Sequence, residues 1–279
     1  AAARERGEDV DQSSDSEPEG ERTPSEFRDF EKASVAQRAA LVSVGFPGPE
    51  WDHFPLTFGF LELYGGKGDL SRAWALQGFV VGPILELGLG WDLLRSDVFA
   101  WLVFLISRRR IWMLAWEPPC TTMSLARYPR LRDKQAPQGY DMLNYETLEG
   151  NGHALQSMFL ALLQLSVGGL HFGEQPAWGS MRFFPSWQLL ESLGSTRTTF
   201  DWCRFGESYR KPTVLLRNTT WLCSLDRRCQ CPAGTKHTVL QGSLTTQASC
   251  YNEEFCREMA QLAWAEKDAC SEYLSQAFE

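Results

Sequence analysis

The chain has 279 residues, 43% of them hydrophobic, and a formal net charge of −8. This composition supports one sizeable core, or one core with a small appendage, and does not mark the chain as a basic nucleic-acid binder. The longest apolar run, Val98 to Ser107, is too short to span a bilayer, and no basic start followed by an apolar segment predicts a signal peptide. The eight cysteines do not form a small disulfide framework, so we expect an intracellular, reducing location and no membrane partner.

Residues 1–32 hold eleven acidic and five basic side chains. They are rich in Ser and Pro and cannot bury enough apolar surface to offset the entropy of ordering. We predict a disordered acidic tail there, then a main domain over residues 33–216 and a small Cys-containing, helical region over residues 217–279. Because the chain begins with Ala, we interpret it as a segment of a longer product or as a processed form.

From residue 56 the hydrophobic pattern alternates between strand-like and helix-like segments. We predict strands over residues 56–63, 79–85, 111–116, 170–172 and 213–216, and helices over residues 33–44, 69–77, 97–108, 153–167 and 253–278. This alternation predicts an α/β fold whose mostly parallel sheet is covered by helices on both faces. In such sheets ligands bind outside the carboxyl ends of the strands, where the unusual loops of this sequence fall.

The first unusual loop, Glu62-Leu63-Tyr64-Gly65-Gly66-Lys67-Gly68, joins the first strand to a helix. Its glycines allow close approach to a ligand, and the helix N-terminus favours an anionic group; a tight turn without a ligand is the alternative. Glu86 ends the second strand and has the chemistry to accept both hydroxyls of a ribose, although it is also interpretable as a capping or surface carboxylate. Asp92 follows, either as an acceptor for an adenine amino group or as a helix cap.

The second loop, Pro118-Pro119-Cys120, holds a thiol on a stiff turn at a strand end. Nearby hydroxyls and Arg127 predict a lowered thiol pKa, and an inert buried cysteine is the alternative. Glu174 ends the next strand, and since neighbouring strands lie about 5 Å apart, Cys120 and Glu174 are expected to face one pocket. No suitably placed histidine completes a hydrolase arrangement, so we interpret His153 and His171 as structural.

In this order the motifs resemble those of the cytosine-5 DNA methyltransferases, and in particular a divergent branch carried in mobile-element polyproteins, over residues 56–242. The glycine loop is similar to the first cofactor motif of that family. Pro118-Pro119-Cys120 with Ser124 is similar to its nucleophile motif, and Glu174 to the Glu of its Glu-Asn-Val motif. Phe205-Gly206 followed by Arg210-Lys211 is similar to its Gly-x-x-Gln-x-Arg-x-Arg stretch.

The resemblance implies a Rossmann-like methyltransferase that uses S-adenosylmethionine to methylate C5 of cytosine in DNA, and hence a nuclear location. It implies catalytic roles for Cys120, Glu174 and Arg210. It implies cofactor contacts from Glu62, Tyr64, Gly66, Gly68, Glu86, Asp92 and Pro118. It implies substrate contacts from Ser124, Arg127 and Lys211. No protein partner is indicated.

Two alternatives to a DNA methyltransferase follow from the departures from that family. Glu117 replaces the usual Gly before Pro-Pro-Cys, and Gln175-Pro176 replaces Asn-Val. These changes motivate a catalytically inactive domain that still binds nucleic acid or a partner. The short region after residue 216 leaves little room for target recognition, which permits an RNA cytosine-5 methyltransferase instead.

A cysteine-rich stretch, Cys223-x5-Cys229-x-Cys231-x5-His237, offers four soft ligands for a metal. Structural zinc usually binds pairs spaced Cys-x2-4-Cys, which this stretch lacks. We therefore predict reduced thiols here and keep zinc as the weaker alternative.

Overall fold

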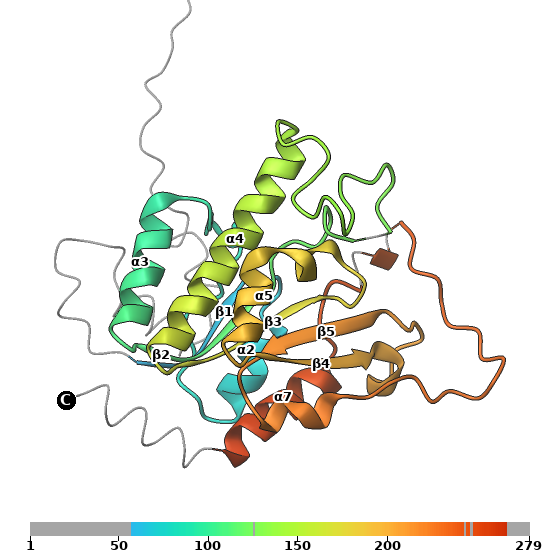
Figure 1. The fold of residues 1–279 in the computed structure, drawn as a ribbon. Helices are drawn as coiled ribbons and strands as arrows, with labels where there is room; N and C mark the ends of the chain where they lie inside the picture. The colour runs from blue at the N-terminus through green and yellow to red at the C-terminus, as the bar shows by residue number, and fades with distance from the viewer. Residues whose placement is uncertain (1–56, 125, 243, 246–247, 267–279) are drawn as a thin grey trace, which may run out of the picture.

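The computed structural model describes residues 57–124, 126–242, 244–245 and 248–266 (Figure 1). The predicted acidic tail, the predicted helix over 33–44 and the end of the predicted C-terminal helix lie outside these residues. Within them, no helix is both long enough and apolar enough to cross a membrane.

The core of the fold is one five-stranded sheet with the order β1-β2-β3-β5-β4. Its strands are β1 (Phe58–Leu63), β2 (Ile111–Trp116), β3 (Leu170–Pro176), β4 (Thr196–Asp201) and β5 (Pro212–Arg217). β1, β2 and β3 are parallel, whereas β5 runs antiparallel to both of its neighbours. The ten residues between β4 and β5 are too few for a crossover, so β5 must return antiparallel. The expected α/β class is confirmed, with a sheet that is mixed.

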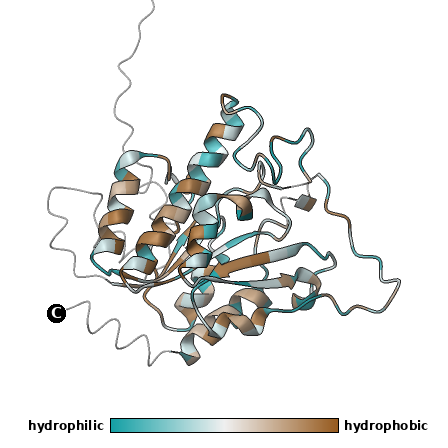
Figure 2. Ribbon diagram, viewed as in Figure 1, coloured by the Kyte–Doolittle hydropathy of each residue, from teal (hydrophilic) through white to brown (hydrophobic). Residues whose placement is uncertain are grey.

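Helices cover both faces of this sheet (Figures 1 and 2). They are α2 (Asp69–Leu76), α3 (Ser96–Ser107), α4 (Tyr145–Ser166), α5 (Pro185–Ser192) and α7 (Glu253–Ala265). Because successive strand side chains point to opposite faces, Leu61 packs with α3, α4 and α5, whereas Phe60 packs with α2 and α7. α7, which we expected in a separate C-terminal region, thus shares the core of the main domain.

The predicted strand over residues 79–85 is wrong as a regular strand. This segment makes only isolated parallel bridges to β1, at Val81 and Leu85. Gly82-Pro83 lies between them, and proline has no N–H to donate to a ladder. The segment still lies along one edge of β1, and β2 pairs with the opposite edge. The chain therefore continues on one side of β1 after that strand and crosses to the other side with β2. Such a switch point is where α/β sheets bind ligands.

Three other elements differ from the predictions. α4 begins at Tyr145, eight residues earlier than expected, because the Asn144 side chain caps it by accepting from Thr147 N at 3.1 Å. β3 extends to Pro176, since its second half pairs with β5. β4 and α5 were not predicted. The first two residues of β4, Thr196 and Arg197, are both exposed, so the sequence of this strand lacks the regular alternation of apolar and polar residues that marks a strand.

Gly173 in β3 is required by the close packing of β2 against β3. A Cβ at this position would lie 2.1 Å from the Trp116 indole. We expect Gly173→Ala to lower the free energy of unfolding by about 3 kcal/mol, because a buried ring must shift. Gly88→Ala is the matched control, since a Cβ there meets no atom within 4 Å. Urea titration of both variants checks this, and equal midpoints would contradict it.

Candidate active site

The carboxyl ends of β1, β2 and β3 open into one cavity of about 620 Å³. Eight of the predicted site residues line it: Tyr64, Gly66, Glu86, Asp92, Pro118, Cys120, Glu174 and Lys211. They come from the loops after β1 and β2, the segment after the β1 bridges, the end of β3 and the start of β5. The structure therefore brings together the three loops that the sequence places at strand ends.

The glycine loop is held by Glu86. The Glu86 carboxylate accepts a hydrogen bond from Gly66 N at 3.1 Å. Gly66 has a φ of +52° and Gly68 a φ of +70°, and both values favour glycine. At Gly68 a Cβ would also lie 2.1 Å from the Ile84 side chain. Asp92 Oδ1 accepts from Leu94 N at 2.9 Å, which makes a local turn ahead of α3 and does not cap it. The glycine loop thus presents its backbone to the cavity, beside the carboxylates of Glu86 and Asp92.

The loop that carries Cys120 is tied to β3 by Gln175. The Gln175 amide donates to Pro118 O at 2.9 Å, so the residue that departs from the family motif has a defined role. Cys120 O then accepts from Met123 N and from Ser124 N, at 3.0 and 2.9 Å, and closes a turn. Ser124 Oγ accepts from Ala126 N at 3.1 Å, and Ser124 does not line the cavity. Ser124 shapes this turn and does not face the site.

Glu174 brings a buried carboxyl to the cavity. Its Oε1 lacks a hydrogen-bond partner among the described residues and lies 4.0 Å from Lys211 Nζ. Burial raises the pKa of Glu174, and Lys211 partly opposes this. Burial and the Glu174 charge also raise the pKa of the Cys120 thiol above its ordinary value, although Lys211 opposes them, so the predicted lowering of this pKa is wrong. Glu174 therefore holds a proton more readily than an exposed glutamate, beside a thiol that responds to its charge.

Lys211, and not Arg127, supplies the positive charge beside the thiol. Arg127 forms an ion pair with Glu146 at 2.6 Å and does not line the cavity, so the prediction that Arg127 is the cation that lowers the thiol pKa is wrong. Lys211 Nζ donates to Ala248 O at 2.7 Å and lies 5.6 Å from the Trp202 ring centre. These contacts fix the ammonium near Glu174.

Arg210, Glu62 and Gly68 also lie outside the cavity lining. Arg210 Nε donates to Asp201 Oδ1 at 3.1 Å, which takes its side chain away from the predicted catalytic role. The Glu62 carboxylate accepts from both the backbone N–H and the hydroxyl of Ser71, in the first turn of α2. Glu62 therefore joins β1 to α2 instead of contacting a cofactor.

Several cavity residues were not predicted from the sequence, among them His153, Glu117 and Tyr251. Glu117 is half-buried with its Oε1 shielded from solvent, and burial raises its pKa well above the ordinary value, with Glu62 and Glu174 raising it further. The Tyr251 hydroxyl lies next to the Glu117 carboxyl, and burial raises the pKa of Tyr251. Tyr251 lies in a loop far along the chain from the motifs, and no local pattern marks it.

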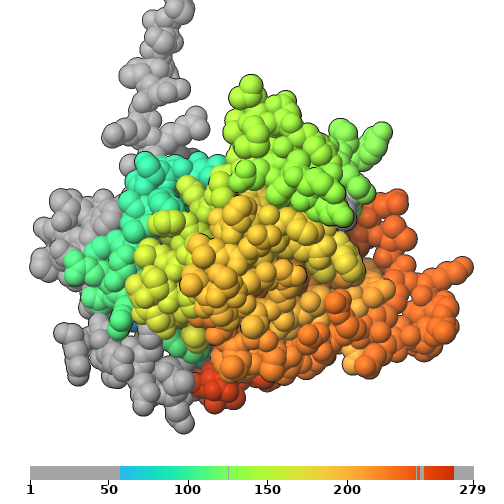
Figure 3. All heavy atoms as spheres, viewed as in Figure 1, coloured from blue at the N-terminus to red at the C-terminus, as the bar shows by residue number. Residues whose placement is uncertain are grey.

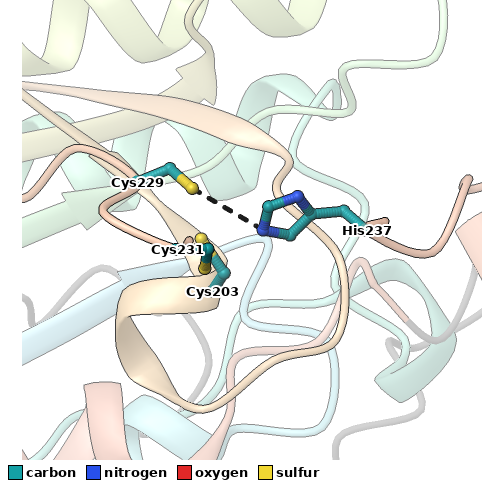
Figure 4. A group of neighbouring side chains, drawn as sticks. All are labelled: Cys203, Cys229, Cys231 and His237. Carbon is teal, nitrogen blue, oxygen red and sulfur yellow. Dashed lines mark hydrogen bonds between the residues drawn. The ribbon is translucent and has the colours of Figure 1, made fainter. Parts of the chain in front are cut away.

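The metal candidate also changes membership. Cys203, Cys229, Cys231 and His237 have ligand atoms within 4.8 Å of one another (Figure 4). Cys223 is exposed and is not part of this group, so its predicted membership is wrong. Cys203 takes its place because β4 leads directly into the short helical turn Trp202–Phe205 beside the cysteine loop.

No protein-family model matches this chain, and no curated protein matches it.

Glu62 should make the stability of the protein depend on pH. Burial raises the pKa of Glu62 from 4.5 to about 7. Between these values the unfolded chain releases a proton that the folded protein keeps, so this carboxyl lowers the free energy of unfolding as pH rises through that window. We expect Glu62→Gln to stabilise the protein by about 2 kcal/mol at pH 8 and hardly at all at pH 5.

Urea titrations at the two pH values measure this difference. Glu266→Gln, which changes an exposed carboxyl at the end of α7, is the control and should show little effect at either pH. An equal gain from Glu62→Gln at pH 5 and pH 8 would contradict the assignment.

Proposed function

We propose that this protein transfers a methyl group from S-adenosylmethionine to C5 of cytosine in DNA, through a covalent bond to Cys120. One observation carries the proposal: Cys120, Glu174 and Lys211 line the same cavity as the glycine loop, Glu86 and Asp92. A nucleophile and a proton donor thus share a cavity with groups suited to a nucleoside. The switch point at β1 supports a Rossmann-like fold as part of the same proposal.

The cavity fits the cofactor in size and chemistry. Its volume of about 620 Å³ is in the range of small-molecule sites, which is about 300–1,000 Å³. A Cβ on Gly66 would meet nothing within 4 Å, so a ligand has open access to that backbone. Gly66, Glu86, Asp92 and Pro118 would hold the cofactor, with Tyr64 offering an aromatic ring to its cation. The bound cofactor supplies an electrophilic methyl group.

The reaction needs a thiolate and a neutral acid at the same time, and the charge coupling in the cavity favours this pair. When Glu174 is protonated, its charge no longer raises the pKa of Cys120, and Lys211 then stabilises the thiolate. Cys120 Sγ bonds to C6 of a cytosine rotated into the cavity, the C5–C6 π electrons move into the C4–C5 bond, the C4–N3 π electrons move onto N3, and N3 takes the proton of Glu174. After C5 is methylated, water takes the C5 proton, the electrons of that C–H bond re-form the C5–C6 double bond, Cys120 leaves as a thiolate, and the N3 proton returns to Glu174.

The departures from the family motif are compatible with activity. Burial raises the pKa of Glu117 well above its ordinary value, so this carboxyl holds a proton more readily than an exposed glutamate and adds less negative charge beside the thiol. Gln175 holds the Pro-Pro-Cys loop through Pro118 O. Glu117 lines the cavity and Gln175 holds the loop beside it, which supports an active enzyme over an inactive relative.

Covalent trapping tests the proposed chemistry. With S-adenosylmethionine and a DNA oligonucleotide containing 5-fluorocytosine, the protein should form an adduct that survives denaturing electrophoresis. Cys120→Ala should form none, and Glu174→Gln should slow adduct formation by about 100-fold, a usual effect of losing a general acid. Cys223→Ala, which removes an exposed thiol outside the cavity, should behave as wild type.

An adduct with Cys120→Ala would contradict the assigned nucleophile. An adduct with an RNA oligonucleotide, and none with DNA, would replace the proposed substrate. Cofactor binding without any adduct would favour an inactive domain.

Cofactor binding by itself tests the nucleoside side of the cavity. We expect Glu86→Ala to weaken S-adenosylmethionine binding by about 10–100-fold, because a hydrogen bond to a charged group contributes about 1.5–3 kcal/mol. Isothermal titration calorimetry measures the affinity. Cys120→Ala should bind the cofactor as wild type does, and equal loss in both variants would contradict the division of roles.

A further inference from the structure

Four potential metal ligands converge outside the cavity, one of them within the turn Trp202–Phe205. The Sγ atoms of Cys203, Cys229 and Cys231 and a ring nitrogen of His237 lie within 4.8 Å of one another, and the three cysteines are free thiols (Figure 4). Cys229 Sγ is 3.6 Å from His237 Nε2. None of the four residues lines the cavity described above.

These separations match a tetrahedral zinc site. Zinc binds thiolate at about 2.3 Å and imidazole at about 2.0–2.1 Å, which puts neighbouring ligand atoms about 3.6–3.8 Å apart. Three thiolates and one imidazole also suit zinc better than magnesium or calcium, which prefer oxygen. We propose that Cys203, Cys229, Cys231 and His237 bind one structural zinc ion. Four protein ligands leave no open position, so the ion has a structural role and not a catalytic one.

The surrounding residues support these ligands. The fully buried Asp201 accepts from Cys229 N at 2.7 Å and from Arg210 Nε at 3.1 Å. Arg204 donates to the Gln230 side chain, between two of the cysteines, at 3.0 Å. A zinc ion with three thiolates carries a net charge of −1, which the two guanidinium groups would offset. The arginine predicted to be catalytic therefore has a role at this site.

The local chain explains why the fold needs a cross-link here. The segment from Asp226 to Leu240, all of it described, contains no helix or strand. Thr238 N donates to Ser208 O at 2.9 Å, one of the few backbone bonds that hold it. Residues of this part of the chain, coloured orange, form a protruding edge of the molecule (Figure 3). A loop this long without regular structure requires another constraint, and a metal bridging it to Cys203 supplies one.

The zinc site also links this loop to the proposed active site. Cys203 lies in the turn that follows β4, and Trp202 N donates to Arg210 O at 2.7 Å. The next residue, Lys211, lines the cavity. Holding Cys203 therefore fixes the connection that carries the ammonium group beside Glu174.

Metal analysis of the full chain tests this proposal without reference to methyl transfer. Protein purified with zinc and then desalted should contain one zinc ion per chain by inductively coupled plasma mass spectrometry. Cys229→Ser and Cys203→Ser should lose at least four-fifths of it. Cys223→Ser, an exposed cysteine close in sequence, is the matched control and should retain it. Chelation should lower the Tm of wild type by about 5–10 °C.

Cobalt binding keeps the proposal falsifiable if a variant fails to fold. Wild-type protein stripped by a chelator under reducing conditions should bind Co²⁺ with the absorption bands of tetrahedral coordination and of thiolate-to-cobalt charge transfer. Absence of zinc from the wild type, a cobalt spectrum without thiolate bands, or a disulfide between Cys203 and either loop cysteine in protein kept reduced would overturn it.

Discussion

Burial of three carboxyls at the carboxyl ends of the strands is the constraint on which this structure depends. Glu62 and Glu174 are buried and Glu117 is half-buried, and burial is the largest cause of the raised pKa in all three. Lys211 is the neighbouring cation, 4.0 Å from Glu174. Carboxyls in such surroundings hold their protons more readily than exposed ones, so this edge of the sheet combines a proton donor with a thiol. That combination is what the proposed methyl transfer requires.

The cavity is shaped largely by residues that do not face it. Glu62 connects β1 to α2, Gln175 holds the loop before Cys120, and Asp201 holds the cysteine loop. Lys211 reaches Glu174 because β5 starts beside the ends of β3 and β4. The proposed zinc site would strengthen the last of these supports.

The sequence predicted those features that depend on local pattern. Each of the three loops follows an apolar strand, and parallel strands end at one edge, so their convergence could be foreseen. The direction of β5 could not, because it depends on pairing with β3 and β4. The sequence also did not predict that Lys211 and not Arg127 lies beside the thiol, that Tyr251 lines the cavity, or that Cys203 and not Cys223 is among the potential metal ligands. All of these are contacts between residues distant in the chain, and the hydrophobic periodicity of the sequence does not predict such contacts.

The central claim is that Cys120, Glu174 and Lys211 share one electrostatic environment. The pH dependence of Cys120 alkylation by iodoacetamide, followed by mass spectrometry of the peptide that contains Cys120, measures the pKa of this thiol directly. Relative to the wild type, the account predicts a lower thiol pKa in Glu174→Gln and a higher one in Lys211→Met. The same titration midpoint in all three proteins would contradict it.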